Sequence, residues 1–520
     1  MNQDFLREWS QLEHWAQSQQ LKNLQSAFKE DPNRVAYFSF EVADIFVDFS
    51  KNWMSRESFN SLIKLAKHAK LQEKIQALFS GQAINTSENK AATHTLQRKT
   101  ASTAEIIHNR QKMYAVAKNY RTGAWKSAFG KKIQAIVNIG IGGSYLGPKL
   151  TVEALSDLQT NNDIKVLFYP SVDSVTLRLI LQQIDLKSTL FCLGSKSLGT
   201  IESIRNSKTI LDLLKKETGY KPSQTRQSFV AATTNATKAY QLLDIPNTHV
   251  MPFDAAVGGR FSVWSSIGFP LLLCIGEQKF IEFLQGAECM DNHFEKTDFK
   301  ENLPVIMAMI SIWYRNFMQL PAYAVIPYDM RLKSLPGWLQ QLTMESNGKM
   351  IGIDGAALKH STSPWLFGDH GQLSQHAFFQ TFHQGKDILP IDFVGVVEND
   401  SNQEFLLVNM LAQSAALMSG EKNTEIQNQC PGNRPSTTLI INKLTPSSLG
   451  QLLALYEHMV FVQSVIWNIN CFDQPGVELG KKLAHTIVNH LEKGCLNQLQ
   501  LDASTQQLLK RTLTNNNLLL

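Results

Sequence analysis

Two short stretches rich in glycine and serine contain residue types that bind anions. In the first, "VNIGIGGSYLGP", an apolar run leads into Gly142, Gly143 and Ser144 before a helix expected to open at Pro148. Backbone amides in such a turn can face an anion. The stretch is not a dinucleotide fingerprint, because Tyr145 takes the third glycine's place, nor a P-loop, because Pro148 stands where lysine is required. Alternatively, the glycines serve only the geometry of a tight turn.

The second stretch, residues 194–203 ("GSKSLGTIES"), combines hydroxyl groups with a cation at another expected strand-to-helix junction. Ser195, Ser197 and Thr200 would supply hydroxyl donors at the first helical turn, where Lys196 adds positive charge. Taken alone, helix capping by Ser195 or Ser197 is the better explanation. Neighbouring ends of parallel strands open onto one crevice, however, so the two turns are expected to converge on one anion such as a phosphate.

A third stretch, "AAVGGRFSVWSSIG", places Gly258 and Gly259 directly before Arg260. The two glycines allow close approach of the backbone. An arginine at such a position would stabilise negative charge that develops during a reaction. The competing interpretation is an ordinary arginine in a surface loop.

The candidate base is Glu345, within "LPGWLQQLTMESNGKM". A helix is expected to begin after Pro336, which places Gln341 four residues before Glu345 and on the same face. Beside the apolar Met344, partial burial would raise the pKa of the Glu345 carboxyl toward neutrality, as a general base requires. A glutamate held in a salt bridge at a helix end is the alternative.

Two further stretches carry candidate acid-base groups. "QLSQHAFFQTFHQG" places His376 at the start of an expected helix, with His383 seven residues later along the same side, although a histidine among aromatic residues is more often structural. "DQPGVELGKKLAHTIVNHL" places Lys481 and Lys482 early in a helix, where solvated lysines are the ordinary interpretation. The sequence contains no HExxH, no paired CxxC and no clustered carboxylate loop, so no metal is expected.

The elements that position these residues follow two patterns. Residues 1 to about 125 have helical spacing, for example in "FNSLIKLAKHAKLQEKIQALFSG", and no clear strand is expected there. From about residue 133, short apolar runs alternate with turns and helices. The runs are "IQAIVNI", "TLFCL", "FVAAT" and "HVMPF", and after the helix "PVIMAMISIWYRNFMQL" they resume as "AYAVIPY", "LPIDFVGVV" and "STTLIIN". This alternation predicts parallel sheets covered by helices on both faces.

Composition sets the class of protein. The chain has 520 residues, 43% hydrophobic and 18% charged, which indicates a globular protein of two domains with extensions. The net charge of +5 is spread along the chain, so nucleic acid is not an expected partner, whereas an anionic small substrate is. Six scattered cysteines predict reduced thiols. With a charged N-terminus and no apolar run of membrane-spanning length, a cytoplasmic location without membrane contact is expected.

Together the motifs resemble the glucose-6-phosphate isomerase family over roughly residues 84 to 488. "IGIGGSYLGP", "VGGRFSVWSSIG", "MESNGK", "QHAFFQTFHQG" and "GVELGKKLA" occur in the family's order. The resemblance implies an α/β fold of two tandem SIS-type αβα domains with parallel sheets. A helical N-terminal extension (1–125) would precede a smaller SIS domain (126–290), a larger one (291–495) and a helical tail (496–520).

The resemblance also implies reversible isomerisation of glucose 6-phosphate and fructose 6-phosphate by a homodimer, without a cofactor. Glu345 would move a proton between C2 and C1, Arg260 would stabilise the enediolate, and His376 of the neighbouring subunit would assist ring opening with Lys481. Substrate contacts would come from Ser144, Ser195, Lys196, Ser197, Thr200, Glu202, Gly143, Gly259 and Gln341.

Several positions depart from the family pattern without removing a proposed catalytic group. They include Lys90 in place of an arginine, Pro475 in place of an aromatic residue, and Gln372, Leu373 and Ser374 before the Gln-His pair, while Arg98 is kept. One competing hypothesis is a non-catalytic sugar-phosphate sensor on the same fold. Another is a transaldolase-like or aminosugar-handling enzyme, although no buried strand lysine stands out as a Schiff-base former. A nucleotide-dependent oxidoreductase fails on the glycine spacing.

Overall fold

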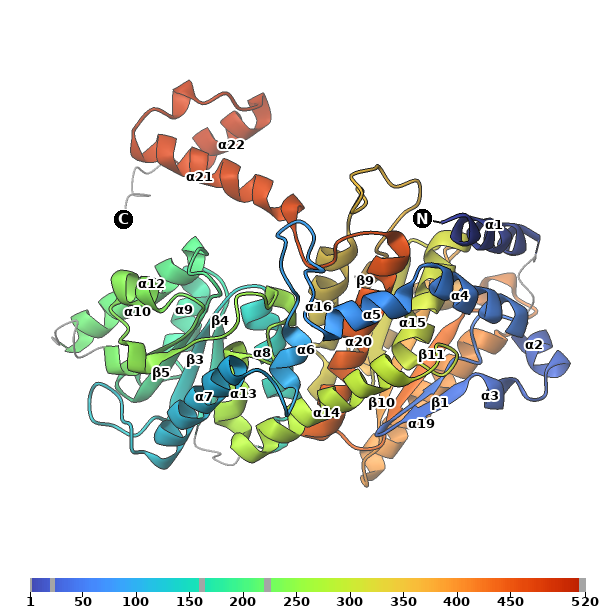
Figure 1. The fold of residues 1–520 in the computed structure, drawn as a ribbon, viewed down its shortest axis with the longest axis horizontal. Helices are drawn as coiled ribbons and strands as arrows, with labels where there is room; N and C mark the ends of the chain where they lie inside the picture. The colour runs from blue at the N-terminus through green and yellow to red at the C-terminus, as the bar shows by residue number, and fades with distance from the viewer. Residues whose placement is uncertain (1, 19–23, 159–163, 219–225, 514–520) are drawn as a thin grey trace. The chain divides into compact units, whose positions relative to one another are not determined.

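The computed structural model describes residues 2–18, 24–158, 164–218 and 226–513, and its ribbon is drawn in Figure 1. The chain divides into two compact units, Met1–Phe472 and Asp473–Leu520. The first unit contains two β-sheets. In the second, the described elements are the helices α21 (Glu478–Glu492) and α22 (Ala503–Thr512) with two short 3-10 turns. Residues 514–520, the end of the predicted C-terminal helix, lie outside the described residues.

The first sheet has five parallel strands. Their order across the sheet is β4 (Lys165–Tyr169), β3 (Ala135–Ile139), β5 (Thr189–Gly194), β6 (Phe229–Ala232) and β7 (Val250–Met251). Alternate side chains of one strand point to opposite faces. In β3, Ile136 therefore packs in one hydrophobic cluster while Val137 and Ile139 pack in another.

Each face of this sheet is covered by helices. The cluster around Ile136 includes residues of α8 (Gly143–Ala154) and α13 (Phe269–Ile275). The opposite cluster includes residues of α9 (Ser174–Leu181), α10 (Ile201–Thr218) and α12 (Ala236–Leu243). The layers are therefore helix, sheet, helix.

The second sheet has six strands and is mixed. Their order is β1 (Ser39–Val42), β2 (Ile45–Asp48), β11 (Ser436–Ile441), β10 (Ile391–Val396), β8 (Ala322–Pro327) and β9 (Trp365–Phe367). The last four run parallel, whereas β2 is antiparallel to both β1 and β11. One face packs in the main core with α15 (Leu303–Ile312), and the other packs on α18 (Phe379–Gln384) and α19 (Ser401–Ser419).

The expectation that residues 1–125 contain no strand is wrong at the β1–β2 hairpin. Ile45 and Val47 alternate with half-exposed residues and are fully buried, and the two-residue turn is made possible by Ala43 at φ 51°. Period-2 alternation is the pattern of a strand with one buried face. The remaining elements of this region are helical. They are α1 (Gln3–Ser18), α2 (Leu24–Glu30), α3 (Arg34–Tyr37), α4 (Arg56–His68), α5 (Leu71–Phe79), α6 (His94–Arg98) and α7 (Ala104–Thr122).

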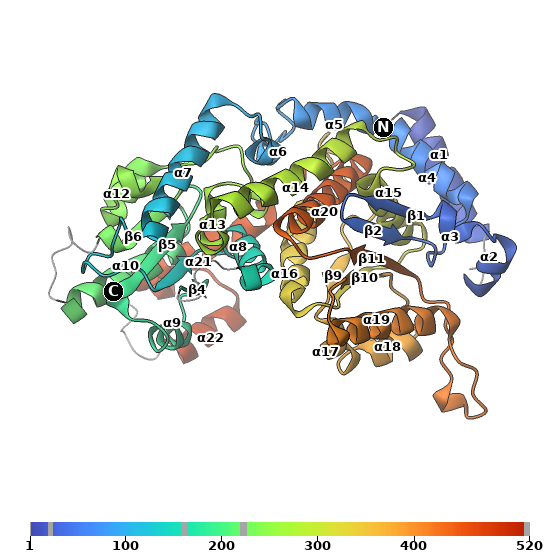
Figure 2. The same ribbon diagram turned by 90° about the horizontal axis from the view of Figure 1, so that it is seen from below.

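Two long helices, α14 (Glu277–Lys296) and α20 (Pro446–Trp467), lie side by side between the sheets, as Figures 1 and 2 both show. A Cβ added at Gly286 would lie 1.9 Å from the carbonyl oxygen of Ser447, so only glycine permits this approach. Among the described residues, α20 alone has the length and composition of a membrane span, with 94% of its apolar window buried inside the fold. The expectation that no apolar run approaches that length is therefore wrong for α20, which serves as a core helix.

The predicted fold class, two α/β units whose sheets are covered by helices, is confirmed; the second sheet is mixed because the antiparallel β1–β2 hairpin extends it. The second compact unit begins at Asp473, inside the range 291–495 assigned to the larger SIS domain. The four predicted domain ranges stay predictions. The helices not yet described are α16 (Leu335–Gln340) and α17 (Gly371–Gln375).

Candidate active site

The first of the two predicted anion-binding turns, called the anion turn below, lies between β3 and α8. The helix α8 begins at Gly143, five residues before Pro148, so the expectation that Pro148 opens the helix is wrong. Proline has no N–H to donate to the carbonyl four residues earlier, which belongs to Ser144. The Asn138 side-chain amide donates to that carbonyl instead, at 3.0 Å. Ser144 consequently lies in the first turn of α8, and its carbonyl, which Pro148 cannot satisfy, accepts a hydrogen bond from Asn138.

The second turn, residues 195–200, lies beside the first. Strands β3 and β5 are neighbours in register, with Ile139 opposite Leu193. A Cβ added at Gly194 would lie 3.3 Å from the Cβ of Ser144. The two turns therefore lie next to each other at the ends of neighbouring strands, while their convergence on one anion stays a prediction.

Side chains at the end of β6 hold the backbone of this second turn. The carbonyl of Lys196 accepts hydrogen bonds from the hydroxyls of Thr233 and Thr234 at 2.9 and 2.8 Å, and the amide of buried Ser195 donates to Ala232 at 3.1 Å. Burial lowers the pKa of the Lys196 ammonium, and nearby Lys90 acts in the same direction. The turn is therefore rigid in its backbone and carries a partly desolvated cation.

Three other predicted binding residues differ in exposure. Thr200 is half-buried directly before α10, whereas Ser197 and Glu202 are exposed. An exposed hydroxyl at this helix end remains accessible to an anion in solution.

Glu345 and Arg260 face each other. The distance from Arg260 Nη1 to Glu345 Oε1 is 3.4 Å, with the arginine side chain 2% exposed and the glutamate side chain 22% exposed. Arg260 Nε donates to the Ser346 hydroxyl at 2.6 Å, and Nη2 donates to the carbonyl of Cys471. The guanidinium is thus fixed from several directions, while the carboxylate keeps an accessible edge.

The helix that carries Glu345 differs from expectation at its end. Residues Leu335–Gln340 form α16, but Gln341–Glu345 form a π-helical turn, η9, in place of a further α-helical turn. Such turns are rare and frequently occur at functional sites. Lys349 Nζ donates to the carbonyls of Glu345 and Ser346 at 3.2 and 2.7 Å, which satisfies the end of the helix.

Two glycines bring the anion turn against these residues. A Cβ added at Gly143 would lie 2.0 Å from the carbonyl oxygen of Gly259 and 2.6 Å from the backbone nitrogen of Arg260. One added at Gly142 would lie 3.0 Å from Nε2 of Gln341, whose Oε1 is buried without a hydrogen-bond partner among the described residues. The structure therefore brings together Ser144, Arg260, Gln341 and Glu345.

The two remaining predicted catalytic residues are His376, in the first unit, and Lys481, in the second. His376 is exposed and follows the last residue of α17, so the expectation that it starts a helix is wrong; His383 lies in α18. Lys481 belongs to the second compact unit, in α21 as expected, where its ammonium pairs with Glu478 at 2.9 Å.

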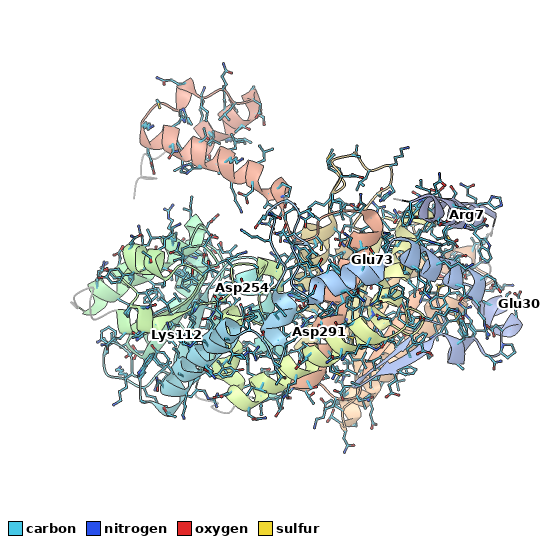
Figure 3. All side chains as sticks on the ribbon, viewed as in Figure 1. Arg7, Glu30, Glu73, Lys112, Asp254 and Asp291 are labelled. Atoms are coloured by element: carbon cyan, nitrogen blue, oxygen red, sulfur yellow. The ribbon has the colours of Figure 1, made fainter. Side chains whose placement is uncertain are left out.

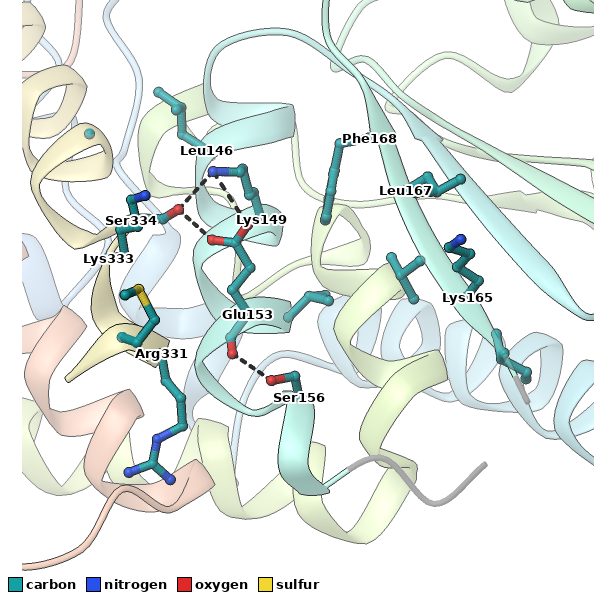
Figure 4. A pocket seen from close by; sticks show the side chains of 15 residues that line it. Leu146, Lys149, Glu153, Ser156, Lys165, Leu167, Phe168, Arg331, Lys333 and Ser334 are labelled. Carbon is teal, nitrogen blue, oxygen red and sulfur yellow. Dashed lines mark hydrogen bonds and ion pairs between the residues drawn. The ribbon is translucent and has the colours of Figure 1, made fainter. Parts of the chain in front are cut away.

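A cavity of about 1190 Å³ lies further along α8 and contains none of the predicted site residues. In its wall, Lys149 Nζ donates to the Ser334 hydroxyl at 2.8 Å and pairs with Glu153 at 3.4 Å, while Ser334 donates to Glu153 (Figure 4). Ser334 directly precedes α16. This contact therefore ties the helix that begins at the anion turn to the helix that leads to Glu345.

The arrangement is suited to proton transfer at carbon. A carboxylate within reach of a buried guanidinium can remove a proton while the cation stabilises the resulting oxyanion. The neighbouring anion turn would hold a distant charged group of the same substrate. Among the described residues, no group of three or more histidine, cysteine, aspartate or glutamate side chains is arranged to hold a metal ion.

Sequence reasoning missed the residues that orient Arg260. Ser346 stood within the "MESNGK" motif, so its proximity to Glu345 was a usable signal. Cys471 lies 211 residues from Arg260 in the sequence. Its carbonyl gave no signal that the sequence could show, since every residue has a carbonyl. All six cysteines are free thiols, as predicted.

Fold and site together define an α/β protein with a site for an anionic small molecule at the ends of its parallel strands. A family model described as phosphoglucose isomerase matches residues 48–509. The chain belongs to the phosphoglucose isomerase family.

Individual relatives agree over nearly the whole chain. "Glucose-6-phosphate isomerase 1" of Chromohalobacter salexigens is 40% identical over 517 residues, covering 96% of this chain and 93% of its own. "Glucose-6-phosphate isomerase" of Methylococcus capsulatus is 38% identical, covering 94% and 95%. The crystal structure of a glucose-6-phosphate isomerase from Chlamydia trachomatis superposes with a TM-score of 0.87 at 30% identity, covering 97% of this chain and 98% of its own.

Proposed function

We propose that this protein interconverts glucose 6-phosphate and fructose 6-phosphate through a cis-enediol intermediate. Glu345 removes the C2 proton of the open-chain aldose and returns a proton at C1, while a proton moves from the O2 hydroxyl to O1. The observation that carries the proposal is the 3.4 Å approach of Glu345 to buried Arg260 beside the anion turn. Membership of the phosphoglucose isomerase family supplies the substrate class.

Arg260 acts on the charge that develops during the reaction. A preorganised cation in a water-poor site stabilises an enediolate more than a cation in solution would. Arg260 is 3% exposed and hydrogen-bonded to Ser346, so it is already in place before a ligand arrives. The electrons of the transferred hydrogen stay within the substrate, so the reaction requires no redox cofactor.

The phosphate group is held by the two turns at the sheet edge. Ser144, Ser195, Lys196, Ser197 and Thr200 are the proposed contacts, with the first turn of α10 adding the field of its backbone amides. Gln341, Glu202 and the backbone at Gly143 and Gly259 line the sugar. Binding the phosphate orients the reacting carbons against Glu345.

Ring opening and assembly complete the proposal. The active form is a homodimer in which His376 reaches the neighbouring site and assists ring opening with Lys481. The exposed position of His376 is compatible with this role. We also assign the protein to glycolysis and gluconeogenesis in the cytoplasm, where free thiols such as its six cysteines are the rule.

The decisive experiment replaces the proposed base. In Glu345→Gln, kcat for fructose 6-phosphate consumption, coupled to a glucose-6-phosphate dehydrogenase readout, should fall by about 10²- to 10⁴-fold. Binding of a phosphorylated sugar acid should persist, because the phosphate turn is intact. The control is Glu73→Gln on the exposed face of α5, which should match the wild type. Robust turnover by Glu345→Gln refutes the base, and an inactive, folded wild type favours a sensor.

A further inference from the structure

A buried cluster of charged side chains is centred on Arg98 in α6. Arg98 Nε and Nη2 donate to the two carboxylate oxygens of Asp291 at 2.8 and 2.5 Å, and Nη1 donates to Glu457 at 2.5 Å. Asp291 lies in α14, as labelled in Figure 3, and also contacts His458 Nε2 at 2.6 Å. All four side chains are at most 2% exposed. The cluster joins α6, α14 and α20.

The two carboxyl groups of this cluster have different proton affinities. Burial raises the pKa of Glu457 to about 7, although Arg98 and Trp264 act against that rise. Burial also acts to raise the pKa of Asp291, but Arg98 and His458 outweigh it and lower that pKa to about 2. Asp291 is therefore the more acidic of the two carboxyl groups, and the donors Arg98 and Trp264 oppose protonation of Glu457.

Glu457 connects the cluster to the segment that carries Arg260. Trp264 Nε1 donates to the two oxygens of Glu457 at 2.9 and 3.1 Å, and the guanidinium carbon of Arg98 lies 4.7 Å from the centre of the Trp264 ring. The same indole stacks on Phe283 of α14 at 4.7 Å. Trp264 is 1% exposed, so it does not touch a substrate itself.

The five residues from Arg260 to Trp264 form a tightly bonded turn. The Ser262 amide and hydroxyl both donate to the Gly259 carbonyl, at 3.2 and 2.6 Å, and the Ser265 amide donates to Ser262 at 2.9 Å. The Phe261 ring packs 4.8 Å from that of His94 in α6. Because these hydrogen bonds make the turn rigid, we expect a displacement of Trp264 to displace Arg260 as well.

We propose that Trp264 and Arg98 are positioning residues for Arg260: Arg98 fixes Glu457, Glu457 holds the indole of Trp264, and Trp264 holds the 259–264 turn against Gly143. The expected effect on kcat rests on the proposed isomerase function, whereas the expected effect on the position of Arg260 does not. Small misplacements of a catalytic group cost rate, since a shift of about 1 Å can reduce turnover about 100-fold.

The test compares two buried tryptophans whose indole N–H groups both donate to a buried acceptor. Trp264→Phe removes the donor to Glu457 and keeps an aromatic ring beside Phe283. Trp313→Phe is the matched control, because Trp313 is 2% exposed and donates to the Trp53 carbonyl at 2.8 Å, a contact that does not involve the 259–264 turn. We expect Tm to fall similarly in both variants. In Trp264→Phe alone, kcat should fall about tenfold while KM changes less than about twofold.

A second measurement reads the position of Arg260 without turnover. Labelling of Arg260 by phenylglyoxal, followed by mass spectrometry of its peptide, should accelerate several-fold in Trp264→Phe relative to Trp313→Phe. Arg98→Lys, which keeps the charge without the fork geometry, should lie between the wild type and Trp264→Phe in kcat. Equal labelling and equal kcat in the two tryptophan variants overturn the inference. If the wild type lacks isomerase activity while labelling is still faster in Trp264→Phe than in Trp313→Phe, the proposed function alone is refuted.

Discussion

Gly143→Ala is the most direct perturbation of the site. The φ of Gly143 lies outside the left-handed region, so alanine strains no backbone torsion there. The new Cβ would instead lie 2.0 Å from the Gly259 carbonyl oxygen, where ordinary contact begins near 3.4 Å. The two segments must then separate by about 1.4 Å, and backbone atoms on both sides prevent a side-chain rotation from relieving the clash.

Rotation of the Gly259 carbonyl away from the new Cβ would break two hydrogen bonds, because this carbonyl accepts from both the amide and the hydroxyl of Ser262. Overpacking of this kind costs about 1 to 3 kcal/mol of stability. A shift of about 1 Å between Ser144 and Arg260 should lower kcat/KM by about 100-fold. The effect on catalysis should therefore exceed what the loss of stability alone would produce.

The assay measures kcat/KM by the coupled reaction and Tm by differential scanning calorimetry. The control is Gly337→Ala in α16, where an added Cβ meets nothing within 4 Å. Because alanine favours a helix over glycine, this control should keep full activity and hold or raise Tm. Wild-type kcat/KM in Gly143→Ala would refute the argument that this contact sets the distance between the anion turn and Arg260.

Two further predictions address assembly and pH. If His376 completes the neighbouring site, mixing unfolded Glu345→Gln and His376→Ala subunits and refolding them should restore about a quarter of wild-type activity, since half the dimers carry one intact site; no recovery would refute the shared site. Burial raises the pKa of Asp392 to about 7 from 3.8. The folded state thus keeps a proton that the unfolded state has lost, so the free energy of unfolding decreases as the pH rises from about 4 to about 7. Asp392→Asn should flatten the decline of Tm over that range, and parallel Tm curves would contradict it.

The strands that sequence reasoning found are those buried on both faces. Every residue of β3, β5 and β10 is buried, as are all but one of β11, which is the pattern of parallel strands under two helical layers. The strands it missed are short or lie at a sheet edge. β9 has three residues, and β4 begins with exposed Lys165. The β1–β2 hairpin lay among helices, and its pairing partner β11 is about 390 residues away.

In the candidate site, too, sequence reasoning found the residues with a local pattern and missed those without one. The two predicted anion-binding turns, Arg260 and Glu345 were recognisable because each lies within a short sequence motif of about six to twelve residues. The cluster of Arg98, Asp291 and Glu457 joins residues 193 and 359 positions apart. No local pattern distinguishes an arginine that will be buried between two carboxylates from one on the surface. Such partners are defined by packing, and only the folded chain reveals them.

The position of Arg260 has a consequence for folding. Its backbone contacts Gly143, at the end of the first sheet, whereas its guanidinium is held by Ser346 and Cys471, which follow α16 and α20. The cation is therefore in place only when both α/β parts of the first unit have folded against each other. The base on η9 and the anion turn on α8 each form within one part, but the group that would stabilise the intermediate depends on both. Catalytic competence therefore requires that both parts be folded and in contact with each other.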